Sequence, residues 1–161
     1  MIWYNIYSCK HSRNSKMSND FMVFSGTANL PLAEKVAAYL GKPLNKIDIK
    51  HFPDGETFCQ VIDPVRGKDV FVIQSGSPAP NEAYMELFVI MDALKRGSAA
   101  RITAVVPYYG YARQDRIFKP GEPESAKVLC KSIGLNCDRV ITIDLHADQI
   151  QGFFDLPMDA L

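Results

Sequence analysis

The chain has 161 residues, of which 47% are hydrophobic and 22% are charged. This balance is typical of a globular domain and excludes an intrinsically disordered protein. Basic and acidic residues number 18 each, so no excess of one charge attracts nucleic acid or a membrane surface. No apolar run approaches the roughly 20 residues of a transmembrane helix. We therefore expect a globular protein with no nucleic-acid partner and no membrane partner.

The amino-terminal residues differ in charge from the rest of the chain. Residues 1–19 hold three basic residues and no acidic one, and we interpret 1–20 as a poorly structured extension before one domain at 21–161. The four cysteines form no CxxC pair and are too scattered for a disulfide framework. This cysteine usage is typical of a reducing compartment, so we expect a cytoplasmic protein.

Apolar periodicity predicts alternating strands and helices from residue 21 onward. A short apolar run at 21–24 precedes a helical pattern that begins at Leu30 and stops at Gly41. Two strand patterns then flank the turn at 52–56, whose proline and glycine favour a hairpin over 47–62.

The second half of the chain continues this alternation. Asn81 is a candidate cap for a helix that extends to about Arg96 and is apolar nearly all round, which indicates burial on more than one side. Further strands are expected at 69–74, 102–106 and 139–143, and a further helix at 126–133. The pattern predicts an α/β fold, a doubly wound and mostly parallel sheet with the hairpin as a small antiparallel addition.

Functional groups gather in two loops that follow predicted strands. One loop contains Arg113, Gln114 and Arg116, and the other begins with Asp144-Leu145-His146. Since the carboxyl ends of parallel strands share one edge of a sheet, both loops should lie on the same rim. The arginine fork matches phosphate oxygens, and carboxylate and imidazole groups can hold Mg²⁺ or orient its ligands. The residues therefore indicate a phosphate or Mg²⁺ site.

Each of these features taken alone has a plainer explanation. A single histidine at a strand end is more often a structural hydrogen-bonding residue than a ligand. A tyrosine-rich loop more often packs on the surface, and Asp54 and Glu56 are ordinary turn residues by themselves. The chain has neither a Walker loop nor a GxGxxG run, so no P-loop or dinucleotide site is predicted.

Several runs together resemble the ribose-phosphate pyrophosphokinase family. In the family's order, they are Phe24-Ser25-Gly26, Phe52 to Glu56, Met85-Glu86-Leu87, Asp92 to Arg96, Tyr108 to Arg116, and Asp144 to Phe154. The last two runs together are highly specific, and the resemblance covers about residues 21–161. It implies a phosphoribosyltransferase-like fold and transfer of a diphosphoryl group from Mg²⁺-ATP to ribose 5-phosphate. The product would be 5-phosphoribosyl 1-diphosphate, for nucleotide biosynthesis.

The resemblance also implies roles for particular residues. Arg113 and His146 would be the catalytic residues. The implied ATP contacts are Phe52, Asp54, Glu56, Arg113, Gln114, Asp115 and His146. The implied Mg²⁺ ligands are Asp144, His146, Asp155 and Asp159. In the family the 52–56 loop reaches the adenine site of a neighbouring subunit, so we expect a homo-oligomer.

The chain departs from the family's pattern in ways that bear on activity. The family has a second α/β domain with the ribose 5-phosphate loop, and this chain stops at Leu161, before that domain. Residues 117–121 also hold a single basic residue, Lys119, where many members have more. We therefore expect the ATP-side half of the enzyme, inactive by itself. The alternatives are a non-catalytic regulatory homologue that associates with active synthetase subunits, or an oligomerisation module built on the apolar helix at 81–96.

Overall fold

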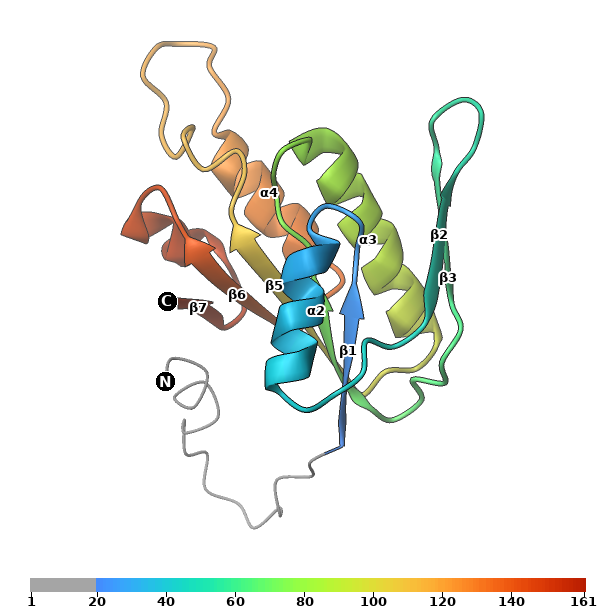
Figure 1. Ribbon diagram of the computed structural model, residues 1–161. Coiled ribbons are helices and arrows are strands. Elements are labelled where there is room, and N and C mark those ends of the chain that lie inside the picture. The colour runs from blue at the N-terminus through green and yellow to red at the C-terminus, as the bar shows by residue number, and fades with distance from the viewer. Residues whose placement is uncertain (1–19) are drawn as a thin grey trace.

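The computed structural model describes residues 20–161, which form a five-stranded sheet and a separate two-stranded hairpin. All five strands of the sheet are parallel, in the spatial order β1-β4-β5-β6-β7 (Figure 1). These strands are β1 (Phe21–Ser25), β4 (Asp69–Ile73), β5 (Arg101–Tyr108), β6 (Arg139–Asp144) and β7 (Met158–Ala160). Their carboxyl ends, and the loops that follow them, therefore share one edge.

Helices cover both faces of the sheet, as the sequence predicts (Figure 1). The helices are α2 (Leu30–Tyr39), α3 (Pro80–Arg96) and α4 (Ser125–Gly134). Val72 and Ile73 point to opposite faces because side chains alternate along a strand. Ile73 belongs to a core cluster with Ala33 of α2, whereas Val72 belongs to the larger cluster with Leu87 of α3. The expected fold class is confirmed. Within residues 20–161, no helix is both long and apolar enough to cross a membrane.

The hairpin lies against α3 and leaves its turn exposed. Its strands, β2 (Ile47–His51) and β3 (Thr57–Val61), are antiparallel as predicted. Ile49 and Cys59 face the core, because alternate residues of a strand share one face. The turn between the two strands projects beyond the body of the domain, on the side of α3 away from α4 (Figure 1).

Several details of the fold differ from the sequence expectations. Asn81 does not cap α3: the cap is Ala79, and Pro80 is the first helical residue. Proline suits that position because it has no N–H to leave unpaired and its φ already matches a helix. Neither β7 nor the 3-10 helix η1 (Asp148–Phe153) was expected, since both are too short for a periodic signal. The expectation for 1–20 lies outside the described residues, apart from Asp20.

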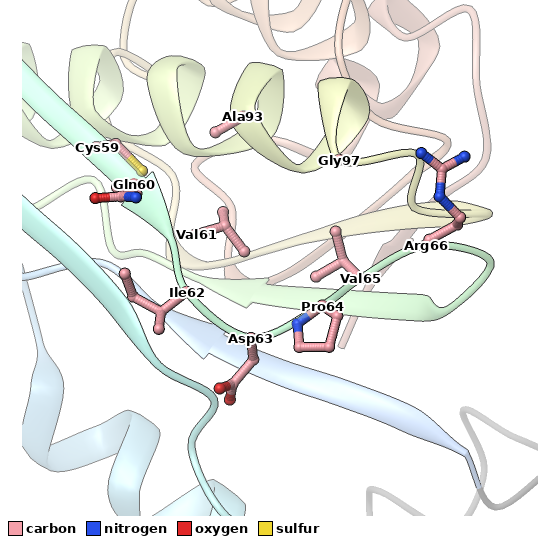
Figure 2. A pocket seen from close by; sticks show the side chains of 10 residues that line it. All are labelled: Cys59, Gln60, Val61, Ile62, Asp63, Pro64, Val65, Arg66, Ala93 and Gly97. Carbon is pink, nitrogen blue, oxygen red and sulfur yellow. The ribbon is translucent and has the colours of Figure 1, made fainter.

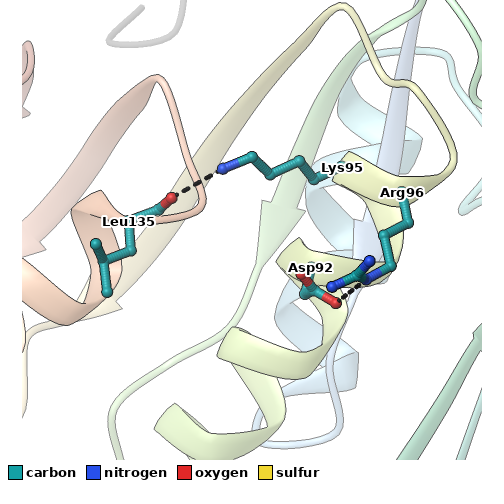
Figure 3. Close-up of polar contacts among 4 residues, drawn as sticks. All are labelled: Asp92, Lys95, Arg96 and Leu135. Atoms are coloured by element: carbon teal, nitrogen blue, oxygen red, sulfur yellow. Dashed lines mark hydrogen bonds and ion pairs between the residues drawn. The ribbon is translucent and has the colours of Figure 1, made fainter.

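The carboxyl-terminal end of α3 is held at the amino edge of the sheet. Lys95 donates from Nζ to the carbonyl of Leu135, after α4, at 3.0 Å (Figure 3). Arg96 pairs with Asp92 one turn earlier, with 2.7 Å between Nε and Oδ2. Cations in the last turn also interact favourably with the helix dipole. The Lys95 contact joins the ends of the two helices at the edge opposite the loops that carry the predicted site.

Candidate nucleotide site

Two loops meet at the carboxyl edge of the sheet. The first, residues 109–116, follows β5 and is called the arginine loop; the second begins at Asp144, at the end of β6. Tyr108 lies opposite Asp144 in the parallel register. Tyr109 donates its backbone N–H to the Asp144 carbonyl at 3.2 Å. The structure therefore places both groups of predicted residues on one rim.

The arginine loop combines buried anchors with exposed guanidinium groups. Tyr109, Ala112 and Asp115 are buried, whereas Arg113 and Arg116 are exposed. Because the buried residues hold the backbone, both arginines face solvent without any local unfolding. An exposed guanidinium on a fixed loop can bind phosphate oxygens bidentately at little entropic cost.

Two predicted ATP contacts, Gln114 and Asp115, bond to neighbouring elements. Asp115 is 8% exposed, and its Oδ2 accepts a hydrogen bond from Nε2 of Gln149 in η1 at 2.6 Å. The side-chain oxygen of Gln114 accepts from Ser125 Oγ at 2.7 Å, and its carbonyl accepts from the Ala126 N–H at 3.0 Å. The loop is thus tied both to η1 and to the start of α4.

Tyr109, a buried aromatic residue of the loop, packs against residues outside it. Its ring makes an edge contact with Phe154, with 6.1 Å between ring centroids. Its hydroxyl lies 3.2 Å from Sγ of Cys130. Burial raises the pKa of the Cys130 thiol to about 11. Cys130 therefore stays protonated at neutral pH and is a packing residue, not a nucleophile.

Asp144 and His146 are exposed at the rim, where a cation could approach them. Among the described residues, no three histidine, cysteine, aspartate or glutamate side chains cluster closely enough to hold a metal by themselves. Mg²⁺ in phosphoryl-transfer sites is commonly bound by one or two carboxylates together with substrate phosphates. An exposed carboxylate and imidazole on the same edge of the sheet as Arg113 fit that kind of shared coordination.

The other two predicted metal ligands lie elsewhere along the chain. Asp159 on β7 forms a bidentate pair with Arg139, at 2.5 and 2.6 Å. It lies opposite Ile141, three residues and so roughly 10 Å along the strand from Asp144. Asp155 lies on the segment that returns to the amino edge, where the Pro157 carbonyl accepts from the Val140 N–H at 3.0 Å. The structure does not gather these carboxylates around Asp144.

The hairpin turn holds Phe52, Asp54 and Glu56, all exposed. Phe52 donates its N–H to the Glu56 carbonyl at 2.8 Å, and Gly55 adopts a φ of 93° that glycine tolerates. Phe52 makes an edge contact with Phe58, with 6.1 Å between ring centroids, and remains 51% exposed. The turn and the arginine loop lie on opposite sides of α3 (Figure 1), so one chain does not bring these two sets together.

Sequence reasoning missed a buried polar network at the same edge. Glu86 of α3 is 2% exposed and accepts from the Thr27 N–H at 2.6 Å, from Thr27 Oγ1 at 2.7 Å and from Gln74 Nε2 at 2.8 Å. Oε1 of Gln74 accepts from the Ala28 N–H at 3.1 Å. The amides after β1 are therefore bound within the protein. The available signal was a glutamate inside an otherwise apolar helix face.

A surface groove of about 430 Å³ lies away from this edge, between β3 and the end of α3 (Figure 2). Residues 59–66 form one wall, and Ala93 and Gly97 form the other. Gly97 follows the end of α3 at the amino edge of the sheet. The groove contains none of the predicted site residues, so it is separate from the candidate nucleotide site.

Comparisons with known proteins agree with the fold and with the motifs at the rim. Residues 21–134 match the N-terminal domain of ribose phosphate pyrophosphokinase. Ribose-phosphate pyrophosphokinases of Fusobacterium nucleatum and Thermotoga maritima are each 52% identical to the chain, over 88% and 89% of it. These alignments span 45% and 46% of the two relatives, so the chain spans about half their length.

A solved structure shows the same architecture. The phosphoribosylpyrophosphate synthetase of Mycobacterium smegmatis superposes with a TM-score of 0.85 and 45% identity, over 88% of this chain and 48% of that one. Family match, sequence identity and fold agree, and the chain belongs to the ribose-phosphate pyrophosphokinase family, matching its N-terminal domain.

Proposed function

We propose that this chain is the nucleotide-binding half of a ribose-phosphate pyrophosphokinase. The complete enzyme would transfer the β,γ-diphosphoryl group of ATP to the anomeric hydroxyl of ribose 5-phosphate. The observation that carries the proposal is the junction of the arginine loop with the end of β6, where Tyr109 donates to the Asp144 carbonyl at 3.2 Å. That junction supports the proposal because it joins the loop that carries the exposed Arg113 to the strand end that carries the exposed Asp144 and His146.

The exposed side chains have distinct tasks in this proposal. The Arg113 guanidinium would bind phosphate oxygens of ATP and neutralise charge that develops there during transfer. Asp144 and His146 would hold Mg²⁺ together with the nucleotide phosphates; bound Mg²⁺ supplies charge neutralisation between the phosphates. Gln114 and Asp115 keep their predicted place beside ATP, in addition to the bonds that anchor the loop. Asp155 and Asp159 remain weaker predicted ligands.

We place the adenine contact of Phe52, Asp54 and Glu56 in a neighbouring subunit. Their turn is exposed and lies across α3 from the arginine loop, which supports a contact between chains rather than within one (Figure 1). A homo-oligomer would thus complete each nucleotide site. Ribose 5-phosphate would bind to the domain that the longer relatives have beyond the matched region.

Equilibrium binding of Mg²⁺-ATP to the purified chain tests the proposal. We expect saturable binding that His146→Ala weakens about tenfold, since it removes one charge-linked contact of about 1.4 kcal/mol. Lys131→Ala, on the exposed surface of α4, is the control and should bind as the wild type does. Absence of saturable Mg²⁺-ATP binding would overturn the proposal and would favour a regulatory homologue without a nucleotide site.

Turnover is a separate measurement. With ATP, Mg²⁺ and ribose 5-phosphate, we expect the chain alone to form no 5-phosphoribosyl 1-diphosphate, because the pentose-phosphate loop belongs to the other domain of the family. Formation of product by this chain would show that its own residues also bind ribose 5-phosphate.

A further inference from the structure

The loop after β4 contacts the end of β5 and the start of the arginine loop backbone to backbone. Gly76 donates its N–H to the Tyr108 carbonyl at 2.9 Å. A Cβ added to Gly76 would lie 2.7 Å from the Gly110 nitrogen, and one added to Gly110 would lie 2.7 Å from the Gly76 oxygen. No side chain fits at either position, so the two glycines allow a close backbone contact, called the glycine joint.

Tyr84 of α3 fills the space beside this joint. It is 3% exposed, and its hydroxyl donates to the Gly110 carbonyl at 3.2 Å. Its ring centroid lies 6.2 Å from that of Tyr109 and 6.3 Å from that of Tyr111. A single side chain therefore contacts three consecutive residues of the arginine loop.

The loop is bent at Tyr111 in a conformation that needs support. Tyr111 has a φ of 64°, in the left-handed region that costs a residue with a side chain about 1–2 kcal/mol. Such a conformation persists only where the surroundings hold it. Here the Tyr111 hydroxyl donates to Oδ1 of Asn81, and the Tyr111 ring lies against Tyr84. Both supporting residues belong to the first two turns of α3.

This part of α3 is itself fixed to the sheet. Glu86 bonds to Thr27 after β1 and to Gln74 after β4, and all three contacts are 2.8 Å or shorter. Gln74 also donates its backbone N–H to the Val105 carbonyl at 2.9 Å. These bonds fix the part of α3 that carries Tyr84 to the sheet. The helix therefore cannot shift to follow a displaced loop.

We propose that Tyr84 is a positioning residue for the nucleotide site: its hydroxyl and ring hold the bend at Gly110 and Tyr111, and so aim Arg113 at the phosphates. The aim at the phosphates rests on the proposed function, whereas the hold on the loop does not. Only two residues separate Gly110 from Arg113, so a change in the bend moves the guanidinium directly.

The test uses Tyr84→Phe, which deletes only the hydroxyl. The matched control is Thr142→Val, which deletes another buried hydroxyl that donates to a backbone carbonyl, that of Val106 within β5, at 2.7 Å. Hydrogen exchange is measured over residues 109–116 without nucleotide, and Mg²⁺-ATP affinity is measured by calorimetry. One hydrogen bond of about 1 kcal/mol corresponds to roughly a fivefold change.

We expect Tyr84→Phe to accelerate exchange in the loop and to raise the Mg²⁺-ATP Kd, each about fivefold, while Thr142→Val changes neither. Unchanged loop exchange in Tyr84→Phe, or equal acceleration in both variants, overturns the inference. If Tyr84→Phe does not fold, Asn81→Ala tests the same bend from an exposed position. If loop exchange responds but the wild type binds no Mg²⁺-ATP, the proposed function fails and the hold on the loop stands.

Discussion

The arginine loop and the hairpin turn both carry predicted nucleotide contacts, but the structure supports them differently. In the arginine loop, Asp115 and Gln114 bond to η1 and α4. In the hairpin turn, Phe52 and Asp54 form hydrogen bonds with other residues of the turn itself. A ligand at the arginine loop therefore meets a surface that this chain organises alone. Side chains on the turn can complete a site only against a second surface.

The largest expected effect comes from the arginine loop. Arg113→Ala should raise the Mg²⁺-ATP Kd about 100-fold, since a bidentate charge-assisted contact is worth about 3 kcal/mol. Thermal stability should hardly change, because Arg113 is exposed. Calorimetry and thermal denaturation measure the two quantities. Arg66→Ala, an exposed arginine beside the groove in Figure 2, is the control, and an equal loss there would contradict a specific site.

A smaller effect is expected on stability, which should depend on the arginine loop but not on the hairpin turn. Asp115→Ala removes the hydrogen bond that the buried Asp115 carboxylate accepts from Gln149, and should lower the free energy of unfolding by about 1.5–3 kcal/mol, as for a hydrogen bond to a charged group. At roughly 2–4 °C per kcal/mol for a chain of this size, thermal denaturation resolves that loss. Asp54→Ala, in the exposed turn, should leave the melting temperature unchanged. Equal destabilisation would show that the turn is also part of the folded framework.

The hairpin turn should reveal its role only through association. Phe52→Ala should not alter stability, but should weaken Mg²⁺-ATP binding about tenfold at concentrations where the chain self-associates, because base stacking on an aromatic ring is worth about 1–3 kcal/mol. At concentrations where sedimentation shows monomers, wild type and variant should bind alike. A loss of affinity in monomers would place the turn in the site of its own chain.

The smallest effect concerns the base of the hairpin at acid pH. Asp63 accepts from the Lys46 N–H at 2.9 Å and from Asn45 Nδ2 at 3.0 Å. The backbone bond to Lys46, followed by the Asn45 bond, lowers the pKa of Asp63 below its ordinary value of 3.8. The stabilisation is therefore complete above that value and is lost as the pH falls through the lower, folded-state pKa.

Asp63→Asn removes this acid sensitivity if the carboxylate is its source. The protection factors of the amides in residues 45–63, which correct for the intrinsic pH dependence of exchange, should fall in the wild type as the pH is lowered from 5 and should depend less on pH in the variant. An identical pH profile for the two proteins would assign the acid response of the hairpin to other carboxylates.

Much of the fold was predictable because it depends on local patterns. The apolar strands, the turn at 52–56 and the helix before Gly41 each have a signal within a few residues, and the strand–helix alternation indicated a covered parallel sheet. The predicted cap of α3 was wrong by two residues, because Pro80 is the first helical residue and Ala79, rather than Asn81, is the cap. β7 was missed because three residues on a sheet edge carry no period.

The candidate site was predictable only as a list of side chains near strand ends. Sequence spacing placed Arg113 and Asp144 on one rim, since parallel strands share a carboxyl edge. It could not show that Asp159 pairs with Arg139, because that contact joins two strands brought together by the sheet register. Nor could it show the network of Glu86, whose partners lie 12 and 59 positions away in the chain.

The sequence by itself determined the fold class and the family, and it predicts a phosphate or Mg²⁺ site, because motif residues and apolar periods are local properties. The tertiary structure decided which side chains are exposed to solvent and which are buried or bonded within the protein. Arg113 stays exposed because Tyr109, Ala112 and Asp115 are buried around it. The bend at Tyr111 is held by α3, which lies about 30 residues earlier in the chain. Burial and long-range contact are properties of the packed molecule, so no reading of neighbouring residues could supply them.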